Sequence, residues 1–346
     1  MKCRVCKNKI TKIYTSPKLP EYIWPGLKNN KFSECKIFVC KKCYSLQLQN
    51  FSKKKIKSFY GKEAYNIITK KDHLLRLDII EKYYGSGFLK NKKIIDIGGG
   101  SNPIINNKNI DVYDFKIANK SIKSLKCNLL IGDIEKINLE KKYNIIFFLH
   151  TLKHLPNPLK AINKIKKILD KDGKIFIEVP NFDYFIKKMP HYAIFHQHLN
   201  IYNLINLKNL FKLANLKIEK VFKNKGAIFC SVIEKDNSNK ICKVDYKNKI
   251  KVLRENLLKQ EKIVRTKFKE NSFNIYGAGG SAALFLANHK FITNKILNIY
   301  DSQNRKVNKI FPGVKKLIKK TYLDSKSPSI SFYKLNKINN LFINEI

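Results

Sequence analysis

The sequence predicts an α/β protein in three parts: a small N-terminal domain, a doubly wound sheet, and a smaller Rossmann-like α/β domain. Three observations predict it. Two Cys-x-x-C pairs lie near the N-terminus, short apolar runs alternate with amphipathic segments from Lys92 onwards, and a strand, glycine turn and helix pattern restarts at Phe273. Such alternation is typical of parallel sheets that carry helices on both faces.

The length and charge of the chain narrow its possible partners. Its 346 residues are enough for two or three domains, and its formal net charge is +44. The excess is almost all lysine and is spread along the chain, whereas nucleic-acid surfaces concentrate charge and favour arginine. No apolar run is long enough to cross a bilayer, and no secretory signal is visible. We therefore expect a cytoplasmic protein with a basic, solvated surface.

The two Cys-x-x-C pairs predict a metal site in the N-terminal domain. In a reducing compartment, two such pairs in one short segment favour tetrahedral zinc over disulfides. Residues 1–55 are also too few to hold a core without a cross-link of this kind. Cys35 lies close to the second pair and is the main competitor for a ligand position. The predicted ligands of this structural Zn²⁺ are Cys3, Cys6, Cys40 and Cys43.

The middle of the chain predicts a helical linker followed by the main sheet. Apolar residues recur at helical spacing within residues 56–90. Residues 91–236 then alternate between strands and helices and close with a hairpin that turns at residues 224–226. The strands are predicted at 92–100, 110–115, 127–134, 143–150 and 174–181, and the helices at 159–173 and 207–216.

The last part, residues 237–346, predicts a second α/β domain. A long helix with one apolar stripe is expected over 246–268. The stretch "FNIYGAGGSAALFLAN" then repeats the order of strand, glycine turn and helix, and "ILNIYDSQNRK" begins the next strand.

The stretch "IIDIGGGSNP" is the most informative cofactor signal. Gly98 and Gly100 follow a buried strand, where the backbone must approach a ligand closely. Alone, this pattern fits NAD or S-adenosylmethionine. Asp96 lies inside the strand end, as in methyltransferase motifs, and "SNP" interrupts the helix start that a pyrophosphate needs. Both features favour S-adenosylmethionine.

Acidic residues also follow the next two strands. Asp114 ends the second strand, where a carboxylate can accept both ribose hydroxyls. Asp133, after the third strand, suits the adenine amino group, with Ile134 against the ring. Each Asp alone could be a helix cap or a turn residue, but three at successive strand ends favour a common site. His150 ends the fourth strand and is a candidate for the methyl-donor pocket, because ligands bind at this edge of such sheets.

Several segments together resemble a known family, the three-domain sugar C-methyltransferases. These have an N-terminal zinc-binding domain, a class I S-adenosylmethionine-dependent methyltransferase domain and a C-terminal Rossmann-like domain. The resemblance rests on both cysteine pairs and, in the same order, on "DIGGGSNP", "HTLKHLPNPLKAI", "FHQHLNIYN", "YGAGGSAALFLAN" and "YDSQNRKVNKIFPGV". It covers nearly the whole chain and implies a methyltransferase.

The resemblance also implies a reaction. Members of this family methylate the carbon beside the ketone of a nucleoside-diphosphate 4-keto sugar, and the second histidine of their His-Glu-His motif is the general base. That role passes to His198, with His196 or Gln197 as a hydrogen-bond partner for the base or the sugar. The chain departs from the family at two positions, with Phe195 in place of Tyr and Gln197 in place of Glu.

Three further residues are candidates for substrate binding. Tyr202, or Tyr192 in its place, is a candidate for the hydroxyl that Phe195 lacks. Gly277 and Gly279, with the helix start after them, would cradle the diphosphate of a nucleotide sugar. The alternative is that these glycines only allow tight packing of strand and helix. A nucleotide sugar is thus the expected partner, and the oligomeric state stays open.

Two other functions stay open from the sequence. An RNA methyltransferase whose zinc module grips nucleic acid would use the basic charge, and its binding would weaken steeply with salt. A non-catalytic module that binds zinc and S-adenosylmethionine is favoured by the departures at Phe195 and Gln197. A metal site at His196 and His198 is disfavoured, because this pair lacks a third ligand nearby.

Overall fold

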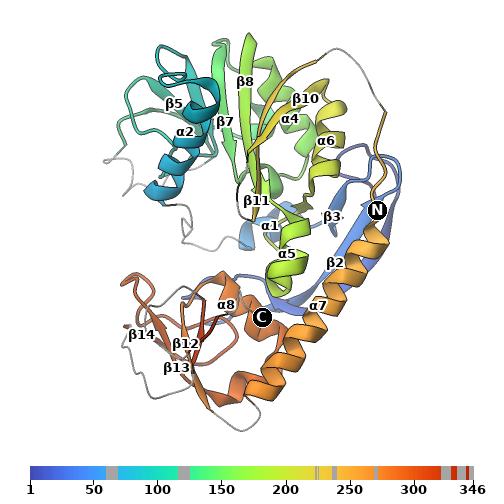
Figure 1. Cartoon of the computed structure of the whole chain (residues 1–346), viewed down its shortest axis with the longest axis vertical. Coiled ribbons are helices and arrows are strands. Elements are labelled where there is room, and N and C mark those ends of the chain that lie inside the picture. The colour runs from blue at the N-terminus through green and yellow to red at the C-terminus, as the bar shows by residue number, and fades with distance from the viewer. Residues whose placement is uncertain are drawn as a thin grey trace.

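The protein folds around three β-sheets (Figure 1). The computed structural model describes residues 1–59, 69–115, 125–222, 224, 226–235, 240–268, 272–320, 329–332 and 340–342. The largest sheet fills the upper half of Figure 1 and the C-terminal sheet the lower half, while the N-terminal strands and the long helix α7 run down one side. Among the helices of this described part, none has the length and apolar character that a membrane span requires.

The largest sheet has seven strands in the order β10-β11-β8-β7-β4-β5-β6. The five consecutive strands from β8 to β6 are parallel to one another, whereas β11 pairs antiparallel with both β8 and β10. The predicted doubly wound arrangement with a closing hairpin is therefore confirmed as a mixed sheet. The strands are β4 (Ile94–Ile97), β5 (Ile110–Asp114), β6 (Asn128–Ile131), β7 (Tyr143–Leu149), β8 (Leu169–Pro180), β10 (Leu216–Phe222) and β11 (Ala227–Glu234).

Two helices that flank this sheet have other bounds than predicted. Predicted helix 159–173 is shorter: α4 covers Pro158–Lys167, and the chain from Leu169 already belongs to β8. The backbone N–H of Tyr143 donates to the carbonyl of Ile168. This hydrogen bond joins Ile168 to β7, so the chain from Leu169 onwards extends the sheet and not the helix. In the linker, α2 (Lys70–Tyr84) begins with a capping box at Thr69, and residues 60–68 lie outside the described part. Predicted helix 207–216 begins and ends earlier, as α6 (Leu204–Lys212), because Leu216 already belongs to β10. The remaining helix is α5 (Phe182–Lys188).

The N-terminal sheet is antiparallel and takes its last strand from the middle of the chain. Its order is β1-β2-β3-β9, with β1 (Ile10–Pro20), β2 (Phe32–Cys40), β3 (Leu46–Leu48) and β9 (Asn200–Ile201). A short helix, α1 (Lys53–Ser58), follows β3. Apolar side chains of these strands share one buried cluster with side chains of α7 and α8. The first fifty residues thus have a core in common with the C-terminal part.

The C-terminal sheet is parallel in the order β14-β13-β12-β15-β16, as a Rossmann-like domain requires. The long helix α7 (Tyr246–Lys267) leads into it, and α8 (Gly280–Asn288) follows its first strand. The strands are β12 (Phe273–Tyr276), β13 (Ile296–Asp301), β14 (Ile318–Lys320), β15 (Ser329–Ser331) and β16 (Asn340–Phe342).

Candidate active site and metal centre

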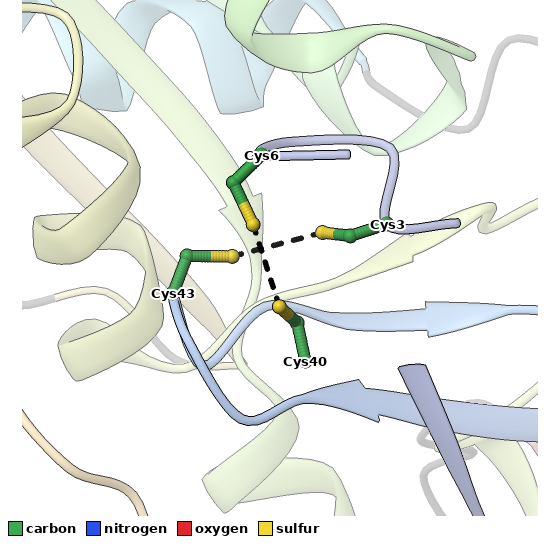
Figure 2. Close-up of side chains that lie close together, drawn as sticks. All are labelled: Cys3, Cys6, Cys40 and Cys43. Atoms are coloured by element: carbon green, nitrogen blue, oxygen red, sulfur yellow. Dashed lines mark hydrogen bonds between the residues drawn. The ribbon is translucent and has the colours of Figure 1, made fainter. Parts of the chain in front are cut away.

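The four predicted cysteine ligands converge on one point (Figure 2). The Sγ atoms of Cys6 and Cys40 lie 3.4 Å apart, those of Cys3 and Cys43 lie 3.6 Å apart, and all four lie within 4.8 Å of one another. A tetrahedral site with Zn–S bonds of about 2.3 Å has sulfurs about 3.8 Å apart. The four thiols are therefore placed to hold one metal ion.

Hydrogen bonds from neighbouring groups act on two of the four thiols, those of Cys3 and Cys6. Hydrogen bonds from Cys43 and Ser45, together with those from backbone N–H groups, lower the pKa of Cys3 to about 4, which favours the thiolate that metals bind. Asn8 Nδ2 also donates to Cys6 Sγ at 3.4 Å. The competing ligand Cys35 is fully buried in a different cluster, where burial raises the pKa of its thiol. It lies outside the metal-binding group that the described residues form.

Arg4, inside the first cysteine pair, connects the metal centre to the segment that carries His198. One Nη atom of its guanidinium donates to the carbonyls of Leu48 and Leu199, at 2.8 and 2.9 Å, and the other donates to Gln49 at 2.8 Å. The side chain is 6% exposed, and burial lowers its pKa to about 10, so it keeps its charge at neutral pH. The cysteine knuckle is thus bonded directly to the residue that follows His198.

The loop after β4 needs its glycines because other side chains occupy the space beside them. Gly98 has a φ of +82°, and a Cβ atom there would lie 2.1 Å from Thr151 Oγ1. A Cβ atom at Gly99 would lie 2.6 Å from the Asp96 carboxylate. Asp96 accepts the N–H of Ile104 at 2.8 Å, and burial, together with the charge of Asp114, raises its pKa to about 7. Asp96 therefore shapes the loop from inside.

The two remaining acidic candidates lie in different settings. Asp114 is buried at the end of β5, and its Oδ2 atom is 3.4 Å from where a Cβ of Gly100 would lie, so strand end and loop meet. Asp133 is exposed and caps a 3₁₀ turn by accepting the N–H of Glu135 at 2.9 Å. Its neighbour Ile134 is buried in the core. At Asp133 the geometry is that of a cap.

Phe115 is a further candidate binding residue at this edge of the sheet, beyond those predicted from the sequence. It follows Asp114 directly, and its side chain is 71% exposed. A large apolar ring at a strand end, beside a glycine loop, is the kind of surface that a bound heterocycle covers. The available signal was an aromatic residue immediately after a strand-end carboxylate.

Buried polar side chains form a chain of contacts along the carboxyl ends of β7 and β8. Arg76 makes a buried ion pair with Glu178, whose Oε1 atom also lies 3.1 Å from His150 Nε2. The Nζ atom of Lys153 lies 3.3 Å from His150 Nδ1. Because Nδ1 faces the amine, the neutral His150 ring donates from Nε2 to Glu178. Burial and the charge of Lys153 lower the pKa of His150.

The predicted base, His198, lies beside this chain. Its ring packs edge-on against that of His154, with centroids 5.4 Å apart, and its centroid is 4.0 Å from that of Phe195. His154 Nδ1 donates to the carbonyl of Gln197 at 2.7 Å, which fixes the ring beside His198. Burial, followed by the charges of Lys153, His154 and His150, lowers the pKa of His198 well below 6.5. The imidazole is therefore neutral at physiological pH.

The neighbours of His198 in the motif turn away from it. The segment makes a tight turn, closed by the N–H of His198 on the carbonyl of Phe195 at 3.1 Å. His196 is fully buried, and its Nε2 lies 2.9 Å from Ser33 Oγ in the N-terminal sheet. Gln197 Nε2 donates to the carbonyl of Phe59. Within the described residues neither side chain makes a hydrogen bond to His198, so both hold the turn against the N-terminal part.

Tyr202 and His198 line a common small cavity. It measures about 10 Å³, roughly room for a single water, and its wall also includes Tyr192. The hydroxyl of Tyr202 is buried without a hydrogen-bond partner among the described residues. Tyr202 also lines a second cavity of the same size, which Cys43 lines as well.

The glycines after β12 form a tight turn against the N-terminal part. Gly277 has a φ of +96°, and its N–H donates to the carbonyl of Tyr300 at 2.8 Å. A Cβ atom at Gly280, the first residue of α8, would lie 2.6 Å from Ile23 Cδ1, whereas one at Gly279 would meet open space. Tight packing therefore explains Gly280, and Gly279 alone keeps a free face.

The family of methyltransferase domains matches the part of the chain that contains this site. The match covers residues 73–221 and is described as "Methyltransferase domain". It includes the glycine loop, the strands β4 to β8 and the histidine cluster. This part of the chain is therefore a methyltransferase domain, and it is built on the mixed α/β sheet described above. No curated protein matches the sequence.

Several solved structures are similar to part of this chain at low sequence identity. The PH0226 protein from Pyrococcus horikoshii OT3 is 13% identical with a TM-score of 0.40, over 54% of this chain and 100% of that one. The plantazolicin methyltransferase BpumL in complex with SAH is 16% identical with a TM-score of 0.40, over 53% and 90%. The mitomycin 7-O-methyltransferase MmcR is 12% identical with a TM-score of 0.34, over 41% of this chain and 48% of that one. The chain thus spans about half of MmcR, and none of these likenesses carries any part of the functional argument.

Proposed function

We propose that the protein is an S-adenosylmethionine-dependent C-methyltransferase that acts on a nucleoside-diphosphate 4-keto sugar, with His198 as the general base. One observation carries the proposal. A neutral, half-buried imidazole at position 198 lies in a cluster of basic side chains at the carboxyl ends of β7 and β8. This cluster is next to the glycine loop, because Thr151 fills the space beside Gly98.

The donor site in this proposal is the loop from Gly98 to Gly100 with Asp114. Ligands of open α/β sheets bind outside the carboxyl ends of the strands, and this loop lies there. Asp96 holds the loop through Ile104, Asp114 would accept the ribose hydroxyls, and Phe115 offers an apolar face for the adenine. When bound, S-adenosylmethionine supplies an electrophilic methyl group. The cap geometry of Asp133 supports no direct contact of that residue with adenine.

The chemistry that we assign to His198 is proton removal from carbon. A ring nitrogen of the neutral imidazole takes the proton beside the ketone, and the C–H electron pair passes into an enolate. The enolate carbon would be the nucleophile for the donor's methyl group, and the donor sulfur would leave with the C–S electron pair. Neighbouring positive groups weaken His198 as a base, but they stabilise the negative charge that forms, and such stabilisation is usually the larger contribution. Phe195 packs against the base and adds no hydrogen bond.

The proposal also assigns the other parts of the chain. Zn²⁺ at the four cysteines is structural, because a site with four thiolates has no position open for a substrate. The domains are residues 1–55, 91–236 and 237–346, with a linker at 56–90, and the free face at Gly279 would admit the nucleotide diphosphate. We further propose that the enzyme works in the cytoplasm. Its lysine-rich surface would favour such anionic substrates.

The test is turnover with a panel of nucleotide 4-keto sugars and S-adenosylmethionine, followed by mass spectrometry of the products. We expect a gain of one methyl group on carbon. His198→Gln should reduce kcat by about 100-fold or more while donor binding persists, because a general base contributes about that factor. His289→Gln, the same change in the C-terminal part, serves as the control and should keep turnover. Equal turnover by His198→Gln and wild type would remove the assignment of the base.

A further inference from the structure

Lys153 is a buried lysine that forms no ion pair with the carboxylates of the described residues. Its side chain belongs to the turn after β7, and the residue is 9% exposed. Within the described part of the chain, no carboxylate lies within ion-pair distance of its Nζ atom, and the one hydrogen bond found there is to His150 Nδ1 at 3.3 Å. An ammonium group has three donors, so this arrangement leaves two for another partner.

Glu178, the acidic side chain whose charge acts on Lys153, is already engaged by other groups. Its Oε2 accepts from Arg76 Nε, and its Oε1 receives Arg76 Nη2 at 3.1 Å, His150 Nε2 at 3.1 Å and Asn224 Nδ2 at 2.9 Å. Arg76 alone balances its charge. Glu178 therefore acts on Lys153 only from a distance, as one of the influences on its pKa.

The other neighbours of Lys153 are basic as well. His150, His154 and His198 gather around the same turn, and none of the three carries a negative charge. Burying an ammonium group without an anion is costly, because the group loses its hydration. Proteins keep such a group where a ligand supplies the anion, and perturbed lysines gather at functional sites for this reason.

We propose that Lys153 is an oxyanion-binding residue, whose ammonium group binds the negatively charged oxygen that forms on the substrate when His198 removes the carbon-bound proton. This inference deepens the proposed function and rests on it. The proton moves to His198, the C–H electron pair moves into the enolate, and the enolate oxygen pairs with Lys153. No oxidant or further reactant is needed. Lys153 thereby does the work of a hydrogen-bond donor, which Phe195 cannot do.

A hydrogen-exchange experiment isolates this step from methyl transfer. Nucleotide 4-keto sugars are incubated with the holoenzyme in D₂O without S-adenosylmethionine, and exchange at the carbon beside the ketone is followed by NMR. We expect exchange by wild type, a fall of about 100-fold or more in Lys153→Met, and partial rescue in Lys153→Arg. Lys160→Met removes an exposed lysine of helix α4 and should exchange like wild type.

A second measurement separates this inference from the choice of substrate. Oxalate, a small dianion that resembles an enolate, is titrated into wild type, Lys153→Met and Lys160→Met by calorimetry. We expect Lys153→Met alone to bind oxalate at least tenfold more weakly. Absent exchange in wild type, with oxalate binding that depends on Lys153, would overturn the keto-sugar substrate and keep the anion site. Wild-type exchange that persists in Lys153→Met, or oxalate binding equal in all three proteins, would overturn the role of Lys153.

Discussion

The buried ion pair between Arg76 and Glu178 gives the sharpest stability prediction. The side chains are 8% and 2% exposed, and they join helix α2 to strand β8 beside His150. Arg76→Met leaves a carboxylate buried without its main partner, which typically costs about 3–5 kcal/mol. His150 and Asn224 still donate to Glu178, so we expect a loss near the lower end, about 3 kcal/mol, in the free energy of unfolding.

Urea unfolding at pH 7 measures this loss, and its dependence on pH tests the reason for it. Burial raises the pKa of Glu178, but hydrogen bonds from His150 and Arg76 lower it to about 2, below the ordinary value of 4.5. The stability from this group is therefore present above pH 4.5 and lost as the pH falls towards 2. Arg76→Met should weaken that dependence, and adding Glu178→Gln should recover most of the stability. Lys251→Met, which removes an exposed pair with Glu255, should cost less than about 0.5 kcal/mol. A loss below about 1 kcal/mol for Arg76→Met would refute the reasoning.

Three further predictions follow from the same site. Gly98→Ala should lower the free energy of unfolding in urea by about 2 kcal/mol or more and weaken donor binding, because φ at this position is positive and the new Cβ would meet Thr151. Gly279→Ala is the control and should leave stability nearly unchanged, because a Cβ there meets open space. Lys153→Met should raise the melting temperature most below pH 7. Burial lowers the pKa of Lys153 from 10.5 to about 7, so the loss of stability from burying this charge is complete below pH 7 and fades as the pH rises to 10.5. A gain in melting temperature that is independent of pH would contradict this prediction. Chelation should release one metal ion per chain, measured by plasma mass spectrometry, and lower the melting temperature, and Cys40→Ser should reproduce that loss of stability.

The main sheet could be predicted from the sequence because its strands are short apolar runs between glycine turns and amphipathic helices. Strands buried on both faces have that pattern whatever else surrounds them. The boundary between α4 and β8 could not be predicted, since Ile168 and Leu169 fit the apolar stripe of a helix as well as the start of a strand. Pairing with Tyr143 decides between them, and that contact is distant in sequence.

The grouping of the four cysteines could also be predicted, because they come in two local pairs. The directions of the side chains in "FHQHL" could not be predicted from the sequence. A tight turn sends His196 and Gln197 to the N-terminal part and leaves His198 beside His154, and only the partners Ser33 and Phe59 fix that choice. Lys153 was hidden for a related reason: in a chain with 70 Lys and Arg residues, no sequence signal marks the one that folding buries.

The bonds of Arg4 have a consequence for the order in which this chain matures. Its guanidinium needs the carbonyl of Leu199, and strand β3 needs β9, so the N-terminal knuckle cannot complete its structure on the ribosome until some two hundred residues have been made. During synthesis Cys3 and Cys6 leave the ribosome first, so their thiols are exposed longest before the rest of the site is complete. A fragment that ends near residue 55 should therefore hold its metal loosely, and late metal insertion should accompany the final folding of the segment that carries His198.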